Sequence, residues 1–464
     1  MYKMPAFIDS HMHFLGMGYV AHLIDLKPYE SIEKMIESIK NMPQTDRIIG
    51  RGWNQERFIE KRSLTKQDLN RISDTLPVVM VRTCGHVLAV NDSMLKLANI
   101  GKDTLYAGTG SIDFETGLIS EDAINLIYQA YPKPLKSDLK KYLIKADEIC
   151  LANGVTSVAS DDFQIFNVPF ETIIDVINEC YEEDLIHVRI TEQANLRTLP
   201  ELKRFIDNGY VNRHYPKFKL GPLKLLVDGS LGGRTALLRE PYADDPLNIG
   251  IRSYANSDLF ALIHLADRSG MDCVIHAIGD AAIDQALDAL IASLKITKRT
   301  HHRHAIIHAQ LADFGHIQRM KAYNIGAIVQ PIFLNSDIEF VKARIGARSK
   351  EAYLFHSMWK EGLKVGFSTD APIELVNPFH NLYCALSRKS IIRPDLPVYL
   401  KEERFSIAEA LECYNGMNLF YTYEQKNLGS IILSADPMTS SDENLLNIEV
   451  LETFIEGRSV YRKS

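Results

Sequence analysis

"MDCVIHAIGDAAIDQALDALIASL", residues 271–294, pairs a short apolar run with a longer periodic one. The first run, 271–277, is of the strand type and contains His276 near its end. From residue 280 onward, apolar residues recur at helical spacing, which is typical of an amphipathic helix packed on a sheet. A buried strand followed by such a helix is one βα unit, and repeated βα units build a parallel sheet.

The same unit recurs along the chain after about residue 140. Most successive strands are separated by about thirty residues, which is the length of a βαβ unit. Eight units predict an α/β fold closed into a (β/α)8 TIM barrel. The expected strands are at 7–13, 154–162, 186–193, 222–230, 271–280, 304–310, 325–333 and 364–372.

One gap of roughly 140 residues separates the first two expected strands. It contains strand-like runs of its own, so we interpret 25–140 as an insertion in the first βα loop, where it would roof the active site. The tail predicts two short strands with a turn at Glu456-Gly457. The predicted organisation is barrel strand 1 at 1–24, the insertion at 25–140, the rest of the barrel at 141–420 and a reduced small β domain at 421–464.

Composition limits the class of partner. A net charge of −7 argues against nucleic acid or an anionic membrane as the main partner and leaves a small-molecule substrate. No stretch is apolar enough to span a membrane, and the N-terminus lacks the pattern of a signal peptide. The six cysteines are scattered without a Cys-x-x-Cys pair, which favours a cytoplasmic location and argues against a thiolate metal site.

Candidate metal ligands gather at the expected strand ends. His11 and His13, two apart in "FIDSHMHF" (7–14), would project from one face of a strand and could chelate one ion. Single histidines of this kind are usually packed or solvated, but the whole set is a nitrogen and oxygen ligand set that favours Zn²⁺, with Mn²⁺ or Fe²⁺ as alternatives and one or two ions. The set is His11, His13, Lys224, His276, His308 and Asp370.

Lys224 has two interpretations. A charged lysine inside the apolar run "PLKLLVD" is costly, so it would form an ion pair with Asp228 or another acid. Alternatively, the neutral amine captures CO2 as a carbamate and bridges two metal ions.

The motifs "FIDSHMHF", "HAIGD", "HAIIHAQ" and "FSTDAP" resemble the amidohydrolase superfamily. Longer stretches, including "GRGWNQERF", "TCGHVLAVN" and "KLLVDGSLGGRTALL", resemble amidohydrolase family 3, the branch that contains N-substituted formamide deformylase. The resemblance runs from about residue 5 to 430 and implies a metal-dependent hydrolase of non-peptide C–N bonds, such as those of N-formyl or N-acyl amines. It also implies a homodimer as an option.

The resemblance assigns roles residue by residue. It implies that the six residues above bind metal, that Lys224 is carboxylated in binuclear members, and that Asp370 also shuttles the proton. His86 matches an insertion-loop histidine near the metals, with a role in catalysis and substrate binding. The resemblance also implies substrate contacts for Trp53, Asp228 and Arg234, although Trp53 is equally expected in the core of the insertion.

Two departures from the family pattern leave other functions open. Ala305 and Ile307 stand where the family commonly has arginine and glutamate beside the strand-6 histidine, which could change the orientation of His308 or the substrate range. The small β domain is also shortened and altered. An esterase or lactonase using the same site is one alternative, and a non-catalytic binding descendant is another.

Overall fold

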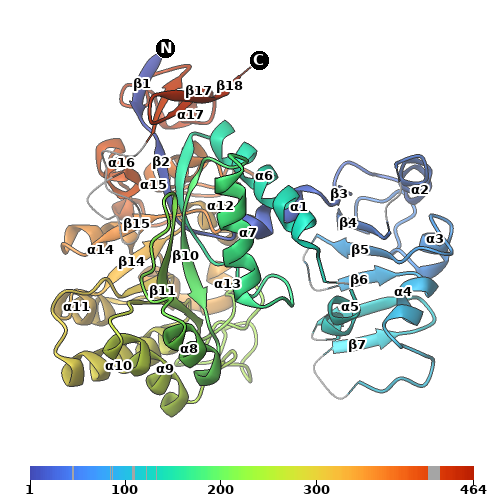
Figure 1. Cartoon of the computed structure of the whole chain (residues 1–464), viewed down its shortest axis with the longest axis horizontal. Coiled ribbons are helices and arrows are strands. Elements are labelled where there is room, and N and C mark those ends of the chain that lie inside the picture. Colours follow the sequence, from blue (N-terminus) through green and yellow to red (C-terminus); the bar gives the residue numbers. More distant parts are fainter. Residues whose placement is uncertain are drawn as a thin grey trace. The chain divides into compact units, whose positions relative to one another are not determined.

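The computed structural model describes residues 1–43, 46–83, 85, 87–106, 110–121, 123–131, 133–415 and 429–463. The chain divides into two compact units. Unit 1 comprises Met1–Gly18 and Lys136–Ser464, and unit 2 comprises Tyr19–Leu135. Figure 1 shows both units, with their elements labelled where there is room.

Unit 1 is built on eight parallel strands that are neighbours in chain order. The first and last strands are joined by backbone hydrogen bonds: His13 N–H donates to the Ala371 carbonyl (2.8 Å) and Asp370 N–H to the His11 carbonyl (3.0 Å). This confirms the predicted α/β barrel. The strands are β2 (Phe7–Met12), β9 (Val155–Ser160), β10 (Arg189–Asn195), β11 (Phe218–Leu226), β12 (Cys273–Ala277), β13 (Ala305–His308), β14 (Gly326–Val329) and β15 (Val365–Phe367).

Helices in the connections cover the outside of the sheet, so a strand such as β9 is buried along its whole length. In α10 (Asp280–Thr297), Asp280 occupies the first turn and residues at helical spacing, such as Ile283, Leu287 and Leu290, are buried. Unit 1 also contains the helices α6 (Lys136–Ala152), α7 (Phe170–Glu182), α8 (Leu199–Asp207), α9 (Asn256–Arg268), α11 (Phe314–Ala322), α12 (Leu334–Asp337), α13 (Val341–Ile345), α14 (Phe355–Lys360), α15 (Pro378–Ser387) and α16 (Ile407–Asn415).

Strand β11 starts earlier than the sequence predicts. It begins at Phe218 rather than at Pro222, because the pairing with β10 continues on both sides of an irregularity. Leu220 pairs with Glu192 and Leu223 pairs with Ala194, so Gly221 and Pro222 fall between the two regular stretches. Proline has no N–H for the ladder, and a β-bulge accommodates it inside a strand.

A buried polar network joins two helices to the starts of β12 and β13. The Asp267 carboxylate accepts hydrogen bonds from Ser293 Oγ, Thr297 Oγ1 and Arg299 Nη1, each at 2.7 Å. His304 Nε2 lies 3.3 Å from the same carboxylate, while His304 Nδ1 accepts the N–H of Cys273 (3.0 Å). His304 therefore has a structural role at the start of its strand, away from the predicted ligands.

The chain termini form a separate antiparallel sheet in unit 1 (Figure 1). Its strands are β1 (Tyr2–Pro5), β16 (Ser430–Leu433), β17 (Val450–Ile455) and β18 (Arg458–Arg462). Glu456 (φ 52°) and Gly457 (φ 80°) form the predicted turn between the last two strands. Glu456 also forms an ion pair with Arg189 at the start of β10, which fixes the terminal sheet to the barrel.

Unit 2 has its own six-stranded mixed sheet in the order β3-β4-β5-β6-β8-β7. Each face of the sheet covers a separate apolar core: Val78 and Met80 belong to one, and Val79 and Val81 to the other. Among the described residues, no helix combines the length and apolar character needed to cross a membrane. The elements are β3 (Ile24–Asp25), β4 (Ile48–Trp53), β5 (Val78–Arg82), β6 (Val87–Val90), β7 (Gly110–Asp113) and β8 (Leu118–Glu121), with α2 (Ile32–Lys40), α3 (Lys66–Asn70), α4 (Asp92–Leu97) and α5 (Ile124–Ala130).

Candidate metal centre

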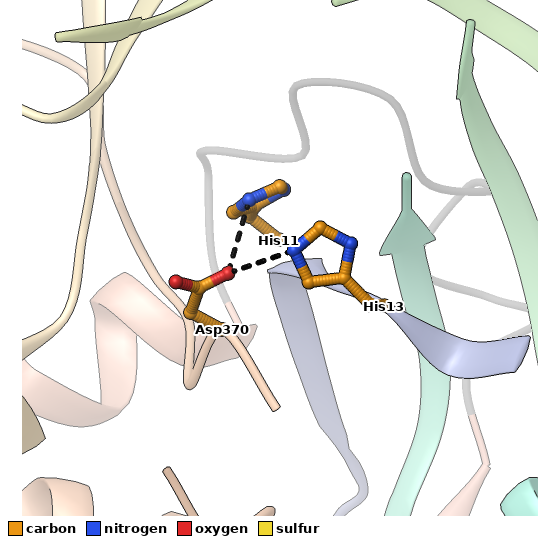
Figure 2. Close-up of side chains that lie close together, drawn as sticks. All are labelled: His11, His13 and Asp370. Atoms are coloured by element: carbon orange, nitrogen blue, oxygen red, sulfur yellow. Dashed lines mark ion pairs between the residues drawn. The ribbon is translucent and has the colours of Figure 1, made fainter. Parts of the chain in front are cut away.

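Three of the predicted ligands converge at the ends of β2 and β15. His11 Nε2 and His13 Nε2 each lie 3.3 Å from Asp370 Oδ1 (Figure 2). One ligand atom from each of the three residues lies within 4.8 Å of the other two. The predicted same-face spacing of His11 and His13 therefore brings both rings to one carboxylate.

In His11 and His13, the ring nitrogen Nδ1, which is not the one beside Asp370, faces a hydrogen-bond acceptor. His11 Nδ1 lies 2.7 Å from Gln193 Oε1, and His13 Nδ1 lies 2.8 Å from the carbonyl of Asp161. A carbonyl oxygen only accepts, so Nδ1 carries the proton and Nε2 is left to face Asp370. Outer-shell acceptors of this kind orient histidine ligands in metal sites.

Asp370 Oδ1 supports the fit of a cation here. This buried oxygen accepts no hydrogen bond of acceptable geometry among the described residues, although two ring nitrogens lie beside it. A buried carboxylate oxygen without a donor is costly, and a cation between the oxygen and the two nitrogens would satisfy all three. The donor set of two imidazoles and one carboxylate fits Zn²⁺, Mn²⁺ or Fe²⁺.

Burial and neighbouring charges shift the pKa values of His11, His13 and Asp370 by different amounts. Burial and the nearby Lys224 ammonium lower the pKa of His11 to about 4. Burial also opposes the charged form of His13, but the Asp370 carboxylate outweighs it and raises the pKa of His13 to about 9. Burial would raise the pKa of Asp370, yet the adjacent imidazoles lower it well below its usual range. Asp370 is therefore an anion at neutral pH and His11 is neutral, whereas His13 carries a second proton that a bound cation would displace.

The remaining predicted ligands lie around this trio. The Lys224 ammonium nitrogen is 3.2 Å from His11 Nε2 and 3.8 Å from Asp161 Oδ2, so its acidic neighbour is Asp161 rather than Asp228. The ring centres of His11 and His308 are 6.0 Å apart, and those of His276 and His308 are 4.4 Å apart. The structure therefore places all six predicted ligands in one contiguous cluster.

Two of these residues adopt backbone conformations that side-chain-bearing residues rarely adopt. His308 has φ 73° and Asp370 has φ 57°. Such conformations cost of order 1–3 kcal/mol each and concentrate at functional sites. Their presence at two predicted ligands, at the ends of β13 and β15, supports a functional centre.

The departure at Ala305 and Ile307 has a packing explanation. Both residues are fully buried and form a small apolar cluster with Val274 and Ile328. His308 is held by a different residue, because its Nδ1 lies 2.8 Å from Gln330 Oε1.

Asp228 has a structural role in this arrangement. Its carboxylate is fully buried and accepts the backbone N–H groups of Leu237, Ile278 and Gly279. His276 Nε2 lies 3.4 Å from the same carboxylate. These contacts connect the loop after β11 to the end of β12 and orient His276, so we do not include Asp228 in the proposed substrate site.

The other predicted substrate residues fall in different places. Arg234 forms an ion pair with Asp244 (3.0 Å), which also contacts Arg344. Trp53 is 1% exposed in the core of unit 2, where its ring stacks on Phe58 and its Nε1 donates to the Met80 carbonyl (2.9 Å). Packing within unit 2 therefore accounts for Trp53. His86 lies outside the described residues.

Sequence reasoning missed the side chains that hold the histidines. Gln193 lies among other polar residues in "ITEQAN", and Gln330 follows the apolar run of "GAIVQ". An uncharged polar residue at an inward-facing position near a strand end is a weak signal, but it is the one that could have identified them.

These observations define a (β/α)8-barrel protein with a histidine and carboxylate centre at the C-terminal ends of its strands. The sequence model of the amidohydrolase family (family 3) matches residues 1–461, and the chain belongs to this family of hydrolases.

Known proteins of similar sequence and structure support this assignment. The chain is 32% identical to YtcJ of Bacillus subtilis (strain 168), a protein named as an amidohydrolase, over 99% of this chain and 89% of that protein. It is 22% identical to the N-substituted formamide deformylase of Arthrobacter pascens, over 99% and 88% of the two chains. A crystal structure of a metal-dependent hydrolase from Pyrococcus horikoshii OT3 matches with a TM-score of 0.79 and 29% identity, covering 95% of this chain and 88% of that one.

Proposed function

We propose that this protein is a metal-dependent hydrolase of an amide-type C–N bond in a small molecule, with N-formyl or N-acyl amines as the substrate class. The observation that carries the proposal is the convergence of His11 Nε2, His13 Nε2 and the unsatisfied Asp370 Oδ1. Membership of the amidohydrolase family and the metal-dependent hydrolase with a similar structure support it.

His11, His13 and Asp370 would hold one divalent ion, and His276, His308 and Lys224 are placed to complete the site or hold a second. A divalent ion bound there, for which Zn²⁺ is the first candidate, lowers the pKa of water toward ~7 and polarises a carbonyl group.

The five described cysteines, which include Cys150 and Cys273, are free and buried, which supports a reducing cytoplasmic location.

Asp370 is the proposed proton carrier. Its carboxylate is ionised and lies at the centre of the cluster, so it can accept the proton that the attacking water gives up. The resulting carboxylic acid then donates this proton to the nitrogen of the leaving amine, and the amine departs neutral. Arg234 and His86 remain proposed substrate contacts.

Lys224 would act as a carbamate. Burial lowers the pKa of Lys224, which increases the fraction of neutral amine available at neutral pH. The neutral Nζ attacks CO2, one N–C bond forms and one proton leaves to solvent. The product is an anionic carbamate on Nζ, the atom that lies 3.2 Å from His11 Nε2.

Metal content tests the proposal directly. We expect about two equivalents of divalent metal per chain in protein purified without chelator, by elemental analysis, falling toward one in Lys224→Ala because the bridging group is lost. Lys219→Ala is the matched control, since Lys219 lies in the same strand but five residues earlier, and it should keep the wild-type content.

Each other outcome has a definite meaning. One equivalent that is unchanged in Lys224→Ala would make Lys224 structural and the enzyme mononuclear. Finding that the protein contains no metal and takes up neither Zn²⁺ nor Mn²⁺ would contradict the proposed catalytic function. Assays with an amide and an ester of the same acyl group then show which bond the enzyme hydrolyses. Hydrolysis of the ester without hydrolysis of the amide would favour an esterase.

A further inference from the structure

Two buried glutamines face the two most enclosed histidines of the centre. Gln193 in β10 and Gln330 at the end of β14 are both fully buried. Gln193 Oε1 lies 2.7 Å from His11 Nδ1, and Gln330 Oε1 lies 2.8 Å from His308 Nδ1. His11 and His308 are each 1% exposed, so water does not compete for these nitrogens.

The partners of each amide determine which of its ends faces the histidine. Gln193 Nε2 donates to the Ser10 carbonyl (3.2 Å), which can only accept, so its oxygen faces His11. Gln330 Nε2 donates to Ser368 Oγ (2.7 Å), and that hydroxyl in turn donates to the Val329 carbonyl (3.4 Å). The oxygen of Gln330 is therefore the end that faces His308.

An acceptor beside Nδ1 requires a proton on Nδ1. The neutral imidazole carries one proton, so Nε2 of each ring keeps its lone pair. For His11 this lone pair faces Asp370 Oδ1 and Lys224 Nζ, which lie at 3.3 and 3.2 Å.

We propose that Gln193 and Gln330 are positioning residues that fix the Nδ1–H tautomer and ring orientation of His11 and His308, so that Nε2 is presented as the metal ligand. This inference rests on the proposed metal-dependent function. The amide does this work without a charge, whereas a carboxylate would add a buried anion beside Asp370 and Asp161. A leucine would remove the acceptor and leave a buried Nδ1–H unsatisfied.

The tautomers can be measured in metal-free wild-type protein. We expect ¹⁵N NMR of selectively ¹⁵N-histidine-labelled protein, assigned with His11→Gln and His308→Gln, to show both rings as the Nδ1–H form. Finding both rings as the Nε2–H form would overturn the inference.

Metal affinity provides the second readout. Gln193→Leu and Gln330→Leu should weaken Zn²⁺ binding about 10–100-fold in a competition assay with a chelating indicator. Gln193→Glu and Gln330→Glu keep the acceptor and should bind more tightly than the leucine variants. Gln310→Leu is the matched control, because Gln310 is also buried but donates to Asp337 (2.9 Å) and Tyr353 (2.7 Å), and its side chain has no hydrogen bond to a predicted ligand among the described residues.

The two readouts separate this inference from the proposed function. Unchanged Zn²⁺ affinity in both leucine variants, or an equal loss in Gln310→Leu, would overturn the positioning role. Zn²⁺ uptake by a wild-type protein with Nε2–H rings would overturn this inference and leave the proposed function standing. Nδ1–H rings in a protein that binds no metal would instead overturn the proposed function and support the tautomer assignment.

Discussion

Replacing Asp370 by asparagine is expected to lower kcat for an N-formyl or N-acyl amine by about 10³-fold, the middle of the range for loss of a general acid–base group. Asparagine keeps the shape and one acceptor oxygen of the side chain but cannot accept the proton or return it to the leaving amine. It also removes the anionic ligand between His11 and His13, so metal content should fall in the same variant. Steady-state kinetics and elemental analysis on one preparation measure both effects.

Asp337→Asn is the control for this variant. Asp337 is partly buried and lies in α12, where its carboxylate accepts hydrogen bonds from Tyr353 (2.6 Å) and Gln310 (2.9 Å). An amide oxygen can accept both bonds, so activity and metal content should stay near wild type. A loss of less than tenfold in Asp370→Asn, with metal retained, would rule out its role as proton carrier.

The Asp267→Asn variant should lose about 3–5 kcal/mol in free energy of unfolding, as when one partner of a buried ion pair is removed. Wild-type Asp267 is fully buried and accepts from Ser293, Thr297 and Arg299. The asparagine amide would place donor hydrogens against these donors and leave Arg299 with Asp272 as its remaining carboxylate. Urea unfolding followed by circular dichroism measures the difference.

The pH dependence of this effect has a defined sign. Burial alone would raise the pKa of Asp267, but hydrogen bonds from His304, Ser293 and Thr297 outweigh it and lower this pKa well below its usual range. A lowered carboxylate pKa contributes stability above the unfolded value of about 3.9, and that contribution is lost as pH falls through the folded value. The gap between wild type and variant should therefore stay constant from about pH 5 to 8 and shrink in acid.

An exposed ion pair serves as the control for the unfolding measurement. Asp395→Asn removes a surface carboxylate that pairs with Arg393 at 3.0 Å, and because water screens an exposed pair its loss should change the free energy of unfolding far less than Asp267→Asn does. Equal losses in Asp267→Asn and Asp395→Asn would contradict the structural role of the buried network.

The barrel was predictable because its signal is local and repeated. Each buried strand and the helix beside it show their own periodicity, as 271–294 does, and eight such units leave little choice of architecture. The start of β11 was not predictable in the same way. Gly221-Pro222 has the local signature of a strand boundary, and only the pairing of Leu220 and Leu223 with β10 shows that the strand continues through it.

The residues of the site also divide into those that the local sequence could predict and those that it could not. His11 and His13 could be placed on one face from their spacing, and His276, His308 and Asp370 from their positions at strand ends. Gln193 and Gln330 could not, because the sequence does not show which side chain an uncharged polar residue of a strand contacts. Asp228 stands beside the conspicuous glycines of "DGSLGG", yet its contacts are with the backbone of a loop some fifty positions away.

The hydrogen bonds between the ends of β2 and β15 build the centre from two segments that lie far apart in the chain. Asp9 accepts from Thr369 N–H and Oγ1 across 360 positions of chain, and the Asp370 N–H reaches back to His11. Contacts of such separation form only after a large loss of chain entropy. A nascent chain that ends before residue 370 contains both histidines of "HMH" but lacks the carboxylate of the proposed trio, so we expect metal to bind only after this last barrel strand has been added.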